Sequence, residues 1–346
     1  MNSFERQLSD KFSSIDLKEI TPGVMVDVYS RGRRKGLLAV GKTYDFYDLA
    51  SLTKILFTAS AAIQYFSENP KELKRPVKEV LPWWRSRQTT PARLMTHTAG
   101  LEWWKPYYQE LKGPMRPEVR WPQLLEMLAE LKPARSTKAV YSDPDLWMTG
   151  AFLSMQTQKS LLELWLQTKD DLRLKELFFH PGNQPKFARN RYAPTEKCGW
   201  RKKTLQGEVH DENCWALAGV APHAGLFGSI EGVSDWGLKL RRAFLDQKTG
   251  FRDNTMVRRF VRRQVPRRIG DWGYCFMKPS KGKTSCGRYF SLESFGHTGF
   301  TGTSLWYDPK KDLLVVILSN RVHPTRENAR FVALRPQIHE WICELL

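Results

Sequence analysis

The chain has 346 residues, of which 41% are hydrophobic and 26% are charged, and its formal net charge is +19. This composition supports a sizeable core and excludes extended disorder, and no apolar run reaches the roughly 18–20 residues of a membrane-spanning helix. The length suits one large domain or two smaller ones.

The location is predicted from the N-terminus and the cysteines. The first residues contain no basic segment followed by an apolar run, so we predict no signal peptide. The five cysteines are an odd number without C-x-x-C spacing, which is typical of free thiols in a reducing compartment. Together these features predict a cytoplasmic protein.

The N-terminal part combines a hairpin with a helix. Residues 23–29 and 37–40 flank a polar loop rich in arginine and glycine, which predicts two paired strands. Residues 51–66 repeat large apolar side chains at helical spacing, and the other faces carry mostly small residues. We therefore expect a helix that is buried on several sides.

The middle of the chain is predicted to be helical and then irregular. Helical spacing marks residues 121–132, 146–155 and 161–166, and Asp143 before Pro144 predicts the N-cap of the second helix. Residues 180–230 are rich in glycine, proline and asparagine, which indicates long loops.

The C-terminal part returns to strands. We predict them over residues 270–276, 288–292, 301–307 and 313–318, followed by a helix that starts near Asn328 or Pro336. The stretch Lys281-Gly282-Lys283-Thr284 ends like a phosphate-binding loop but lacks its first glycine, so we interpret it as a turn. Strands at both ends predict an α+β fold with one sheet built from both termini. We expect a single domain, with an α/β part over about 1–60 and 225–346 and a helical insertion over about 61–224.

Three short motifs carry reactive side chains. In Ser51-Leu52-Thr53-Lys54 the spacing puts serine and lysine side by side on a helix, whose N-terminus favours a developing oxyanion beside Ser51. A lysine buried among apolar residues loses its charge readily, so we expect Lys54 to accept the serine proton.

The second motif is Tyr141-Ser142-Asp143, in which a tyrosine beside a lysine is held partly as phenolate and relays protons. The third is His297-Thr298-Gly299, which we expect to open a strand. There Gly299 lets a substrate approach the backbone, Thr298 can bind a carboxylate or carbonyl, and the Phe300 amide can donate to an oxyanion.

Together, in this order and context, these motifs resemble the serine β-lactamase and penicillin-binding-protein superfamily, with its S-x-x-K, Y/S-x-N and K-T-G elements. Residues 207–213 and 223–227, and the block from His297 to Pro324, look like the class C-like, esterase-like branch. The resemblance covers roughly residues 20–345. It implies a mainly antiparallel sheet flanked by helices, with an inserted helical subdomain and the site between them.

By this resemblance Ser51 is the acylated nucleophile, Lys54 and Tyr141 shuttle protons, and His297 takes the third-motif position. The amides of Ser51 and Phe300 form the oxyanion hole. Two departures matter: Asp143 stands where many members have asparagine, and His297 where β-lactamases usually have lysine. Both changes disfavour substrates that carry a carboxylate, as β-lactams do, and favour esters.

The remaining features are expected to play supporting roles. Three adjacent residues, His210-Asp211-Glu212, rarely converge on one ion, so we predict a loop-stabilising network, with His210 lining the pocket and no metal or cofactor. Asp143, Thr298 and Gly299 are expected to contact substrate. The arginine-rich stretch over 258–268 is expected to be a solvated helix face and loop rather than a specific nucleic-acid surface.

We therefore predict a serine hydrolase that acts on a small acyl substrate, with an ester as the favoured class. A β-lactamase or D-Ala-D-Ala carboxypeptidase is the alternative enzyme. A catalytically weak scaffold that binds a polyanion is a third interpretation, against which the retained Ser51, Lys54 and Tyr141 argue. The sequence leaves the oligomeric state and the protonation of His297 open.

Overall fold

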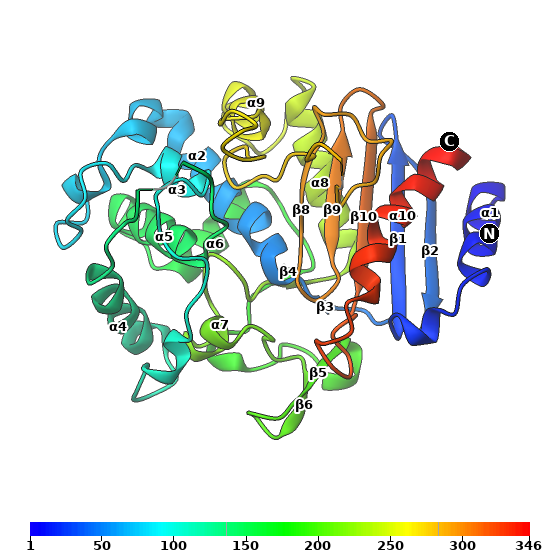
Figure 1. Cartoon of the computed structure of the whole chain (residues 1–346), viewed down its shortest axis with the longest axis horizontal. Helices are drawn as coiled ribbons and strands as arrows, with labels where there is room; N and C mark the ends of the chain where they lie inside the picture. Colours follow the sequence, from blue (N-terminus) through cyan, green and yellow to red (C-terminus); the bar gives the residue numbers. More distant parts are fainter. Residues whose placement is uncertain (136, 283) are drawn as a thin grey trace.

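The computed structural model describes residues 1–135, 137–282 and 284–346. Its centre is a five-stranded, fully antiparallel sheet with the strand order β2-β1-β10-β9-β8 (Figure 1). The strands are β1 (Gly23–Ser30), β2 (Arg33–Gly41), β8 (Phe295–Thr298), β9 (Ser304–Asp308) and β10 (Leu313–Ser319). Since Val24 pairs with Ser319, both chain ends build one sheet, as the sequence predicts.

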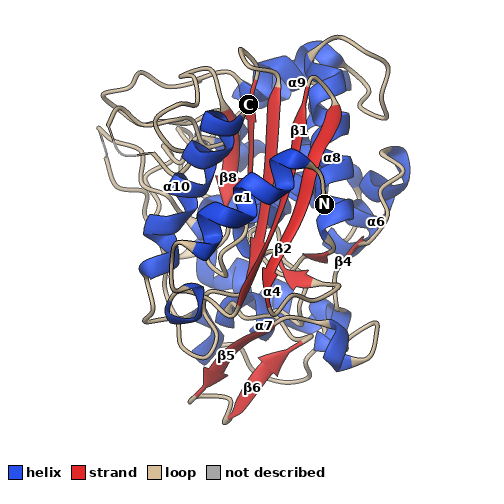
Figure 2. Ribbon diagram, turned by 90° about the vertical axis from the view of Figure 1, so that its right-hand side faces the viewer, coloured by secondary structure: helices blue, strands red, loops and turns tan. Residues whose placement is uncertain are grey.

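Helices cover both faces of this sheet (Figure 2). Side chains of β10 alternate between the faces, because successive residues of a strand point in opposite directions. Leu313, Val315 and Ile317 share a cluster with α1 (Ser3–Ser13) and α10 (Arg330–Leu345). The intervening β10 residues belong to the larger core that includes α8 (Ile230–Phe244).

Between the early and late strands the chain forms a helical region, the left half of Figure 1. Its helices are α2 (Ser60–Glu68), α3 (Pro91–Met95), α4 (Pro117–Ala129), α5 (Asp143–Thr157) and α6 (Leu161–Asp171). This arrangement confirms the α+β class, while the exact limits of the insertion stay a prediction. Among the described residues, no helix is both long and apolar enough to cross a membrane.

The stretch predicted as long loops contains more regular structure than its composition indicates. It holds the hairpin of β5 (Pro194–Cys198) and β6 (Lys203–Gln206), the short helix α7 (Glu212–Ala216) and β7 (Phe227–Gly228). Strand β7 joins β3 (Tyr47–Asp48) to β4 (Leu177–Phe178) in a second small sheet. This sheet places the chain just before Ser51.

The strands predicted over 270–276 and 288–292 are wrong. Cys275 has a left-handed φ of 62°, which no regular strand accommodates, and only isolated bridges join Trp272 and Gly296 to Met277. The amide of Ser291 donates to the Asp308 side chain instead of a strand partner. The turn predicted around Lys283 includes a residue outside the described part of the chain. The third strand runs over 304–308 rather than 301–307, so the His297 motif ends β8 instead of opening a strand.

The helix predicted over 51–66 winds in three ways. Residues 50–52 form a 3₁₀ turn, 54–59 a π-helix and 60–68 the α-helix α2. Because residues 54–59 are all buried, the apolar pattern does not distinguish one winding from another. The predicted cap of α5 also shifts by one residue: Ser142 accepts the capping hydrogen bond from the Asp145 amide, which leaves the Asp143 carboxylate free for another partner.

The arginine-rich stretch over 258–268 spans the end of α9 (Asn254–Val261) and the loop behind it. Arg258 pairs with Asp246 and Arg263 with Asp271, so part of its charge is neutralised locally. None of its residues lines the cavity described below.

Candidate active site

The three motifs meet at one cavity of about 790 Å³. It is lined by most of the side chains that the sequence singles out: Ser51, Tyr141, Asp143, His210, His297, Thr298, Gly299 and Phe300. Lys54 is buried directly behind Ser51 and does not line the cavity. Segments from both halves of the fold therefore contribute to one site.

Ser51 stands on a strained turn. Ala50 has a left-handed φ of 46°, although it carries a Cβ, and such strain is common at functional sites. The buried carboxylate of Asp48 compensates, because its Oδ1 accepts the Ala50 amide at 2.8 Å and its Oδ2 accepts the His210 amide at 2.7 Å. Sequence reasoning missed Asp48, whose position after a two-residue strand gives little signal.

Two donors converge on the Ser51 hydroxyl. Lys54 Nζ donates to Oγ at 2.9 Å, and the Tyr141 hydroxyl donates to Oγ at 2.9 Å. Lys54 Nζ also lies 4.9 Å from the centre of the Tyr141 ring. This serine, amine and phenol are thus in direct contact, as the motif spacing predicts.

The ammonium of Lys54 is held more firmly than we expected. Besides Ser51 it donates to the His223 carbonyl at 3.1 Å and forms an ion pair with Asp143 at 2.8 Å. Burial alone would lower the pKa of Lys54, but the negative charge of Asp143 and the contact with Tyr141 outweigh it, so the pKa lies above its ordinary value. The expectation that burial discharges Lys54 is therefore wrong for the resting site.

Tyr141 is also protonated at rest. Burial raises the pKa of the Tyr141 phenol, and the nearby Asp143 carboxylate adds to this, while Lys54 opposes it. The expected partial phenolate is not the resting form. One proton must leave the Lys54–Tyr141 pair before the pair can accept the proton of Ser51.

Asp143 belongs to a small acidic group. One ligand atom each from Asp143, Asp211 and His223 lies within 4.8 Å of the others. His223 Nδ1 accepts the Trp147 indole N–H at 2.8 Å, so its Nε2 carries the proton shared with Asp211 at 3.0 Å. The Lys54 ammonium, in contact with Asp143, supplies positive charge to this group.

His297 is neutral in the folded protein. Burial, assisted by the charge of Lys54, lowers the pKa of His297 to about 3. Nδ1 lies 2.8 Å from the Thr298 carbonyl and donates to it, while the ring centre lies 5.9 Å from that of Tyr141. His297 therefore brings no positive charge to the third motif.

The turn after β8 is tied to the nucleophile turn by two hydroxyls that sequence reasoning missed. Thr301 Oγ1 donates to the Asp48 carbonyl at 2.8 Å, and Thr303 Oγ1 donates to the Leu49 carbonyl at 3.0 Å. These bonds fix the Phe300 amide relative to Ser51. Among the described residues, the Phe300 amide donates to no backbone or side-chain acceptor, so it is free for a ligand. The alternation of threonine and glycine over 298–303 is the signal that could have revealed them.

Gly299 lines the cavity, so its contact with substrate stays a prediction, and the structure adds a second reason for glycine here. A Cβ built there would lie 2.0 Å from Thr303 Oγ1 and 2.7 Å from the Leu49 carbonyl oxygen. The packing of this turn by itself therefore requires glycine. Among the residues that the structure describes, the Thr298 hydroxyl makes only a long contact of 3.9 Å, with the Met277 sulfur.

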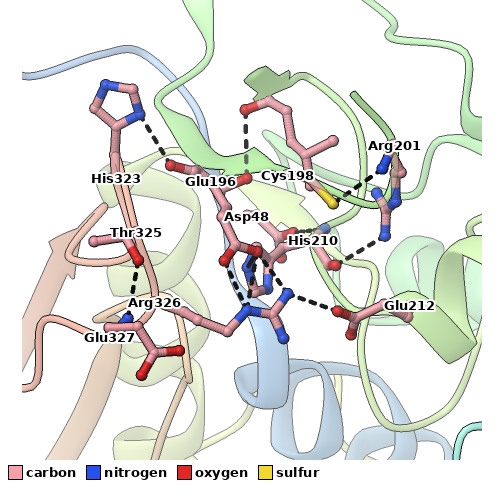
Figure 3. A network of polar contacts seen from close by, with 12 residues as sticks. Asp48, Glu196, Cys198, Arg201, His210, Glu212, His323, Thr325, Arg326 and Glu327 are labelled. Carbon is pink, nitrogen blue, oxygen red and sulfur yellow. Dashed lines mark hydrogen bonds and ion pairs between the residues drawn. The ribbon is translucent and has the colours of Figure 1, made fainter. Parts of the chain in front are cut away.

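His210 reaches the cavity as part of a network (Figure 3). Its Nε2 lies 3.2 Å from Glu196, and its ring stacks on Phe300 with 5.7 Å between the centres. Arg326 lies between Glu196 and Glu212, at 2.6 Å from each (Figure 3). Since these polar groups satisfy one another, the predicted loop-stabilising network is present and His210 lines the pocket.

The chain is similar to known proteins over most of its length. A family model described as Beta-lactamase matches residues 5–336. An N-acetylmuramyl-L-alanine amidase of Bacillus subtilis (strain 168) is 26% identical over 321 residues, which are 82% of this chain and 69% of the amidase.

Two solved structures share the fold with a TM-score of 0.70 and 18% identity, each covering 97% of this chain and 99% of the other. They are EstCE1, a hydrolase with promiscuous acyltransferase activity, and a class C beta lactamase from Rhodobacter sphaeroides.

Proposed function

Because the chain belongs to the beta-lactamase family of serine hydrolases, we propose that it hydrolyses carboxylic esters through an acyl-enzyme formed on Ser51. The observation that carries this proposal is the pair of 2.9 Å hydrogen bonds from Lys54 and Tyr141 to the Ser51 hydroxyl at the wall of a cavity. Both partners can exchange a proton with the nucleophile.

In the proposed first step, Ser51 Oγ attacks the ester carbonyl carbon, and its proton passes to the deprotonated member of the Lys54–Tyr141 pair. The amides of Ser51 and Phe300 donate to the developing oxyanion. When the intermediate collapses, the carbon–oxygen bond to the alcohol breaks and the alcohol takes a proton from the same pair. Water then attacks the acyl carbon and gives up a proton to the pair. The bond between the acyl carbon and Ser51 Oγ breaks, the pair returns the proton to Oγ, and the acid leaves.

Two features support an ester as the substrate. His297 is neutral and Asp143 is a carboxylate paired with Lys54, so neither supplies the permanent cation or the amide that the resemblance associates with lactam and peptide substrates. The cavity is also lined by Trp103, Trp104 and Trp272, which suit an apolar acyl or alcohol group. We also propose a reducing compartment, the cytoplasm, since all five cysteines are free thiols.

The test is intact-mass analysis after reaction with a 4-nitrophenyl phosphonate ester and, separately, with a penicillin. We expect one phosphonate adduct per chain, mapped to Ser51 by peptide mass spectrometry, and turnover of 4-nitrophenyl acetate. A penicillin adduct at Ser51 without ester turnover would favour the alternative, a lactam- or peptide-directed enzyme. Absence of any adduct and of any turnover would reject the proposal.

The pH dependence of the reaction gives a second prediction. Since the pKa values of both Lys54 and Tyr141 are raised, kcat/KM should increase with pH into the alkaline range. In Asp143→Asn the carboxylate that favours the ammonium and disfavours the phenolate is gone, so both pKa values fall. We expect the rising limb of the kcat/KM–pH profile to move to lower pH by about one unit or more.

The measurement is kcat/KM for a neutral ester between pH 5 and pH 10. Asp235→Asn is the matched control, because it removes a half-exposed carboxylate of α8 that pairs with Lys239 and does not line the cavity. If the rising limb of the pH profile stays in place in Asp143→Asn, or moves to higher pH, this carboxylate does not set the protonation of Lys54 and Tyr141.

A further inference from the structure

Two arginines of the cavity lack an acidic partner. Arg321 follows β10 and Arg335 lies on α10; both line the cavity, and each is only 5% exposed. Nη1 of Arg321 donates to the Asn328 carbonyl at 3.0 Å, and Nη1 of Arg335 donates to the Thr303 carbonyl at 2.9 Å. In the described part of the chain neither guanidinium forms an ion pair, and the Nε of each is buried without a hydrogen-bond partner.

A third arginine of the same cavity shows the contrast. Arg326 is neutralised by Glu196 and Glu212 (Figure 3). Lys54, behind the cavity, is likewise paired with Asp143. Buried charges in proteins are normally compensated in this way, because removing a charge from water without a counter-charge is costly. Arg321 and Arg335 differ from these two residues, because no described carboxylate compensates their charge.

The pKa values of both arginines show that their charges are not compensated. Burial lowers the pKa of Arg335 to about 10, and the charge of Arg321 adds to the effect. Burial also lowers the pKa of Arg321. Both guanidinium groups remain charged at neutral pH. Two like charges are therefore buried near each other in the wall of the cavity. A bound anion would relieve their repulsion.

Their position links them to the reacting group. Arg335 also donates to the Gly299 carbonyl at 3.4 Å, and the guanidinium of Arg321 lies 4.6 Å from the centre of the Phe300 ring. Both arginines thus adjoin the turn that carries the Phe300 amide, and the same cavity holds Ser51. One small molecule can therefore reach both places.

We propose that Arg321 and Arg335 form a subsite for a carboxylate carried by the ester substrate itself. The proposal rests on the proposed esterase function and names the substrate class, an ester with an anionic end. The planar guanidinium matches the two oxygens of a carboxylate and can bind it through two parallel hydrogen bonds. Under this proposal the positive charge that His297 does not supply is provided by Arg321, just after β10, and by Arg335 on α10.

The test compares each carboxylate ester with its uncharged methyl ester. One pair, 4-acetoxybenzoate and methyl 4-acetoxybenzoate, places the charge on the alcohol side. The other, mono-4-nitrophenyl glutarate and its methyl ester, places it on the acyl side. We expect kcat/KM to favour the charged form by about tenfold or more in at least one pair, and 0.5 M salt to reduce this preference.

In Arg321→Met and Arg335→Met the ratio of charged to uncharged kcat/KM should fall about tenfold, and Arg321→Lys should retain part of it. The ratio is taken within each variant, so a general loss of competence cancels. Arg330→Met is the matched control, because this arginine lies on the same helix but is exposed and paired with Glu19. Its ratio should equal that of the wild type.

A ratio of one or less in both pairs, or a preference that survives the loss of both arginines, would overturn the subsite. Binding of 4-acetoxybenzoate to Ser51→Ala, measured by calorimetry, separates this outcome from failure of the proposed function. If no ester is hydrolysed but binding needs Arg321 and Arg335, only the esterase assignment fails. If the uncharged esters are hydrolysed and binding is absent, only the subsite fails.

Discussion

Ser51→Ala is expected to lower ester turnover by at least about 10⁴-fold, since removal of the nucleophile of an acyl-transfer enzyme leaves only the contribution of the surrounding groups. The fold should persist. Lys54 keeps the His223 carbonyl and the Asp143 carboxylate as partners, and Tyr141, which loses its bond to Ser51, keeps its ring contacts with His97 and Trp272. Steady-state rates with 4-nitrophenyl acetate and a thermal melt measure the two effects.

Ser67→Ala is the control for this variant. Ser67 lies at the end of the same helical segment, on α2, where its hydroxyl donates to the Ile63 carbonyl at 2.6 Å. It should retain the wild-type rate and lose at most about 1 kcal/mol of stability. Full esterase activity in Ser51→Ala would place the chemistry on another residue and remove the basis of the mechanism.

Gly299→Ala should be the second most damaging change. The new methyl group would clash with Thr303 Oγ1 at 2.0 Å and with the Leu49 carbonyl oxygen at 2.7 Å, and the latter belongs to the backbone before Ser51. The turn must open, which moves the Phe300 amide away from the position of the oxyanion. We expect kcat to fall by about 10²–10³-fold and the free energy of unfolding to fall by about 1–3 kcal/mol.

Gly199→Ala provides the matched control, because nothing lies within 4 Å of a Cβ built there. If Gly299→Ala does not fold, Thr303→Val tests the same connection, since it removes the hydroxyl bond to Leu49 with little change in shape. It should lower kcat more than it raises KM. Wild-type kcat in both variants would show that this turn does not orient the oxyanion donor.

The motifs revealed the site better than the surrounding architecture. The positions of Ser51, Lys54, Tyr141 and His297 follow from local spacing and from the resemblance, and the structure brings all four together. The protonation of Lys54 could not be predicted in the same way. It depends on Asp143, which is distant in sequence, and on a helix cap that falls on Ser142 rather than on Asp143.

The missed elements have short or ambiguous signals. Strand β8 has only four residues, with glycine and histidine among them, so it shows no apolar alternation. The segment over 270–276 does alternate, but Cys275 is left-handed. Arg321 and Arg335 looked like two of many basic residues in a chain of charge +19. Only burial distinguishes them from the solvated ones.

The pairing of β1 with β10 has a consequence for how the chain is made. Since β10 lies between β1 and β9, the middle of the main sheet is synthesised long after the N-terminal hairpin that it pairs with. The hairpin of β1 and β2 keeps an open edge until β10 has been synthesised. Such non-local closure is slow, so this edge stays exposed to other chains for longer than it would in a protein of local contacts.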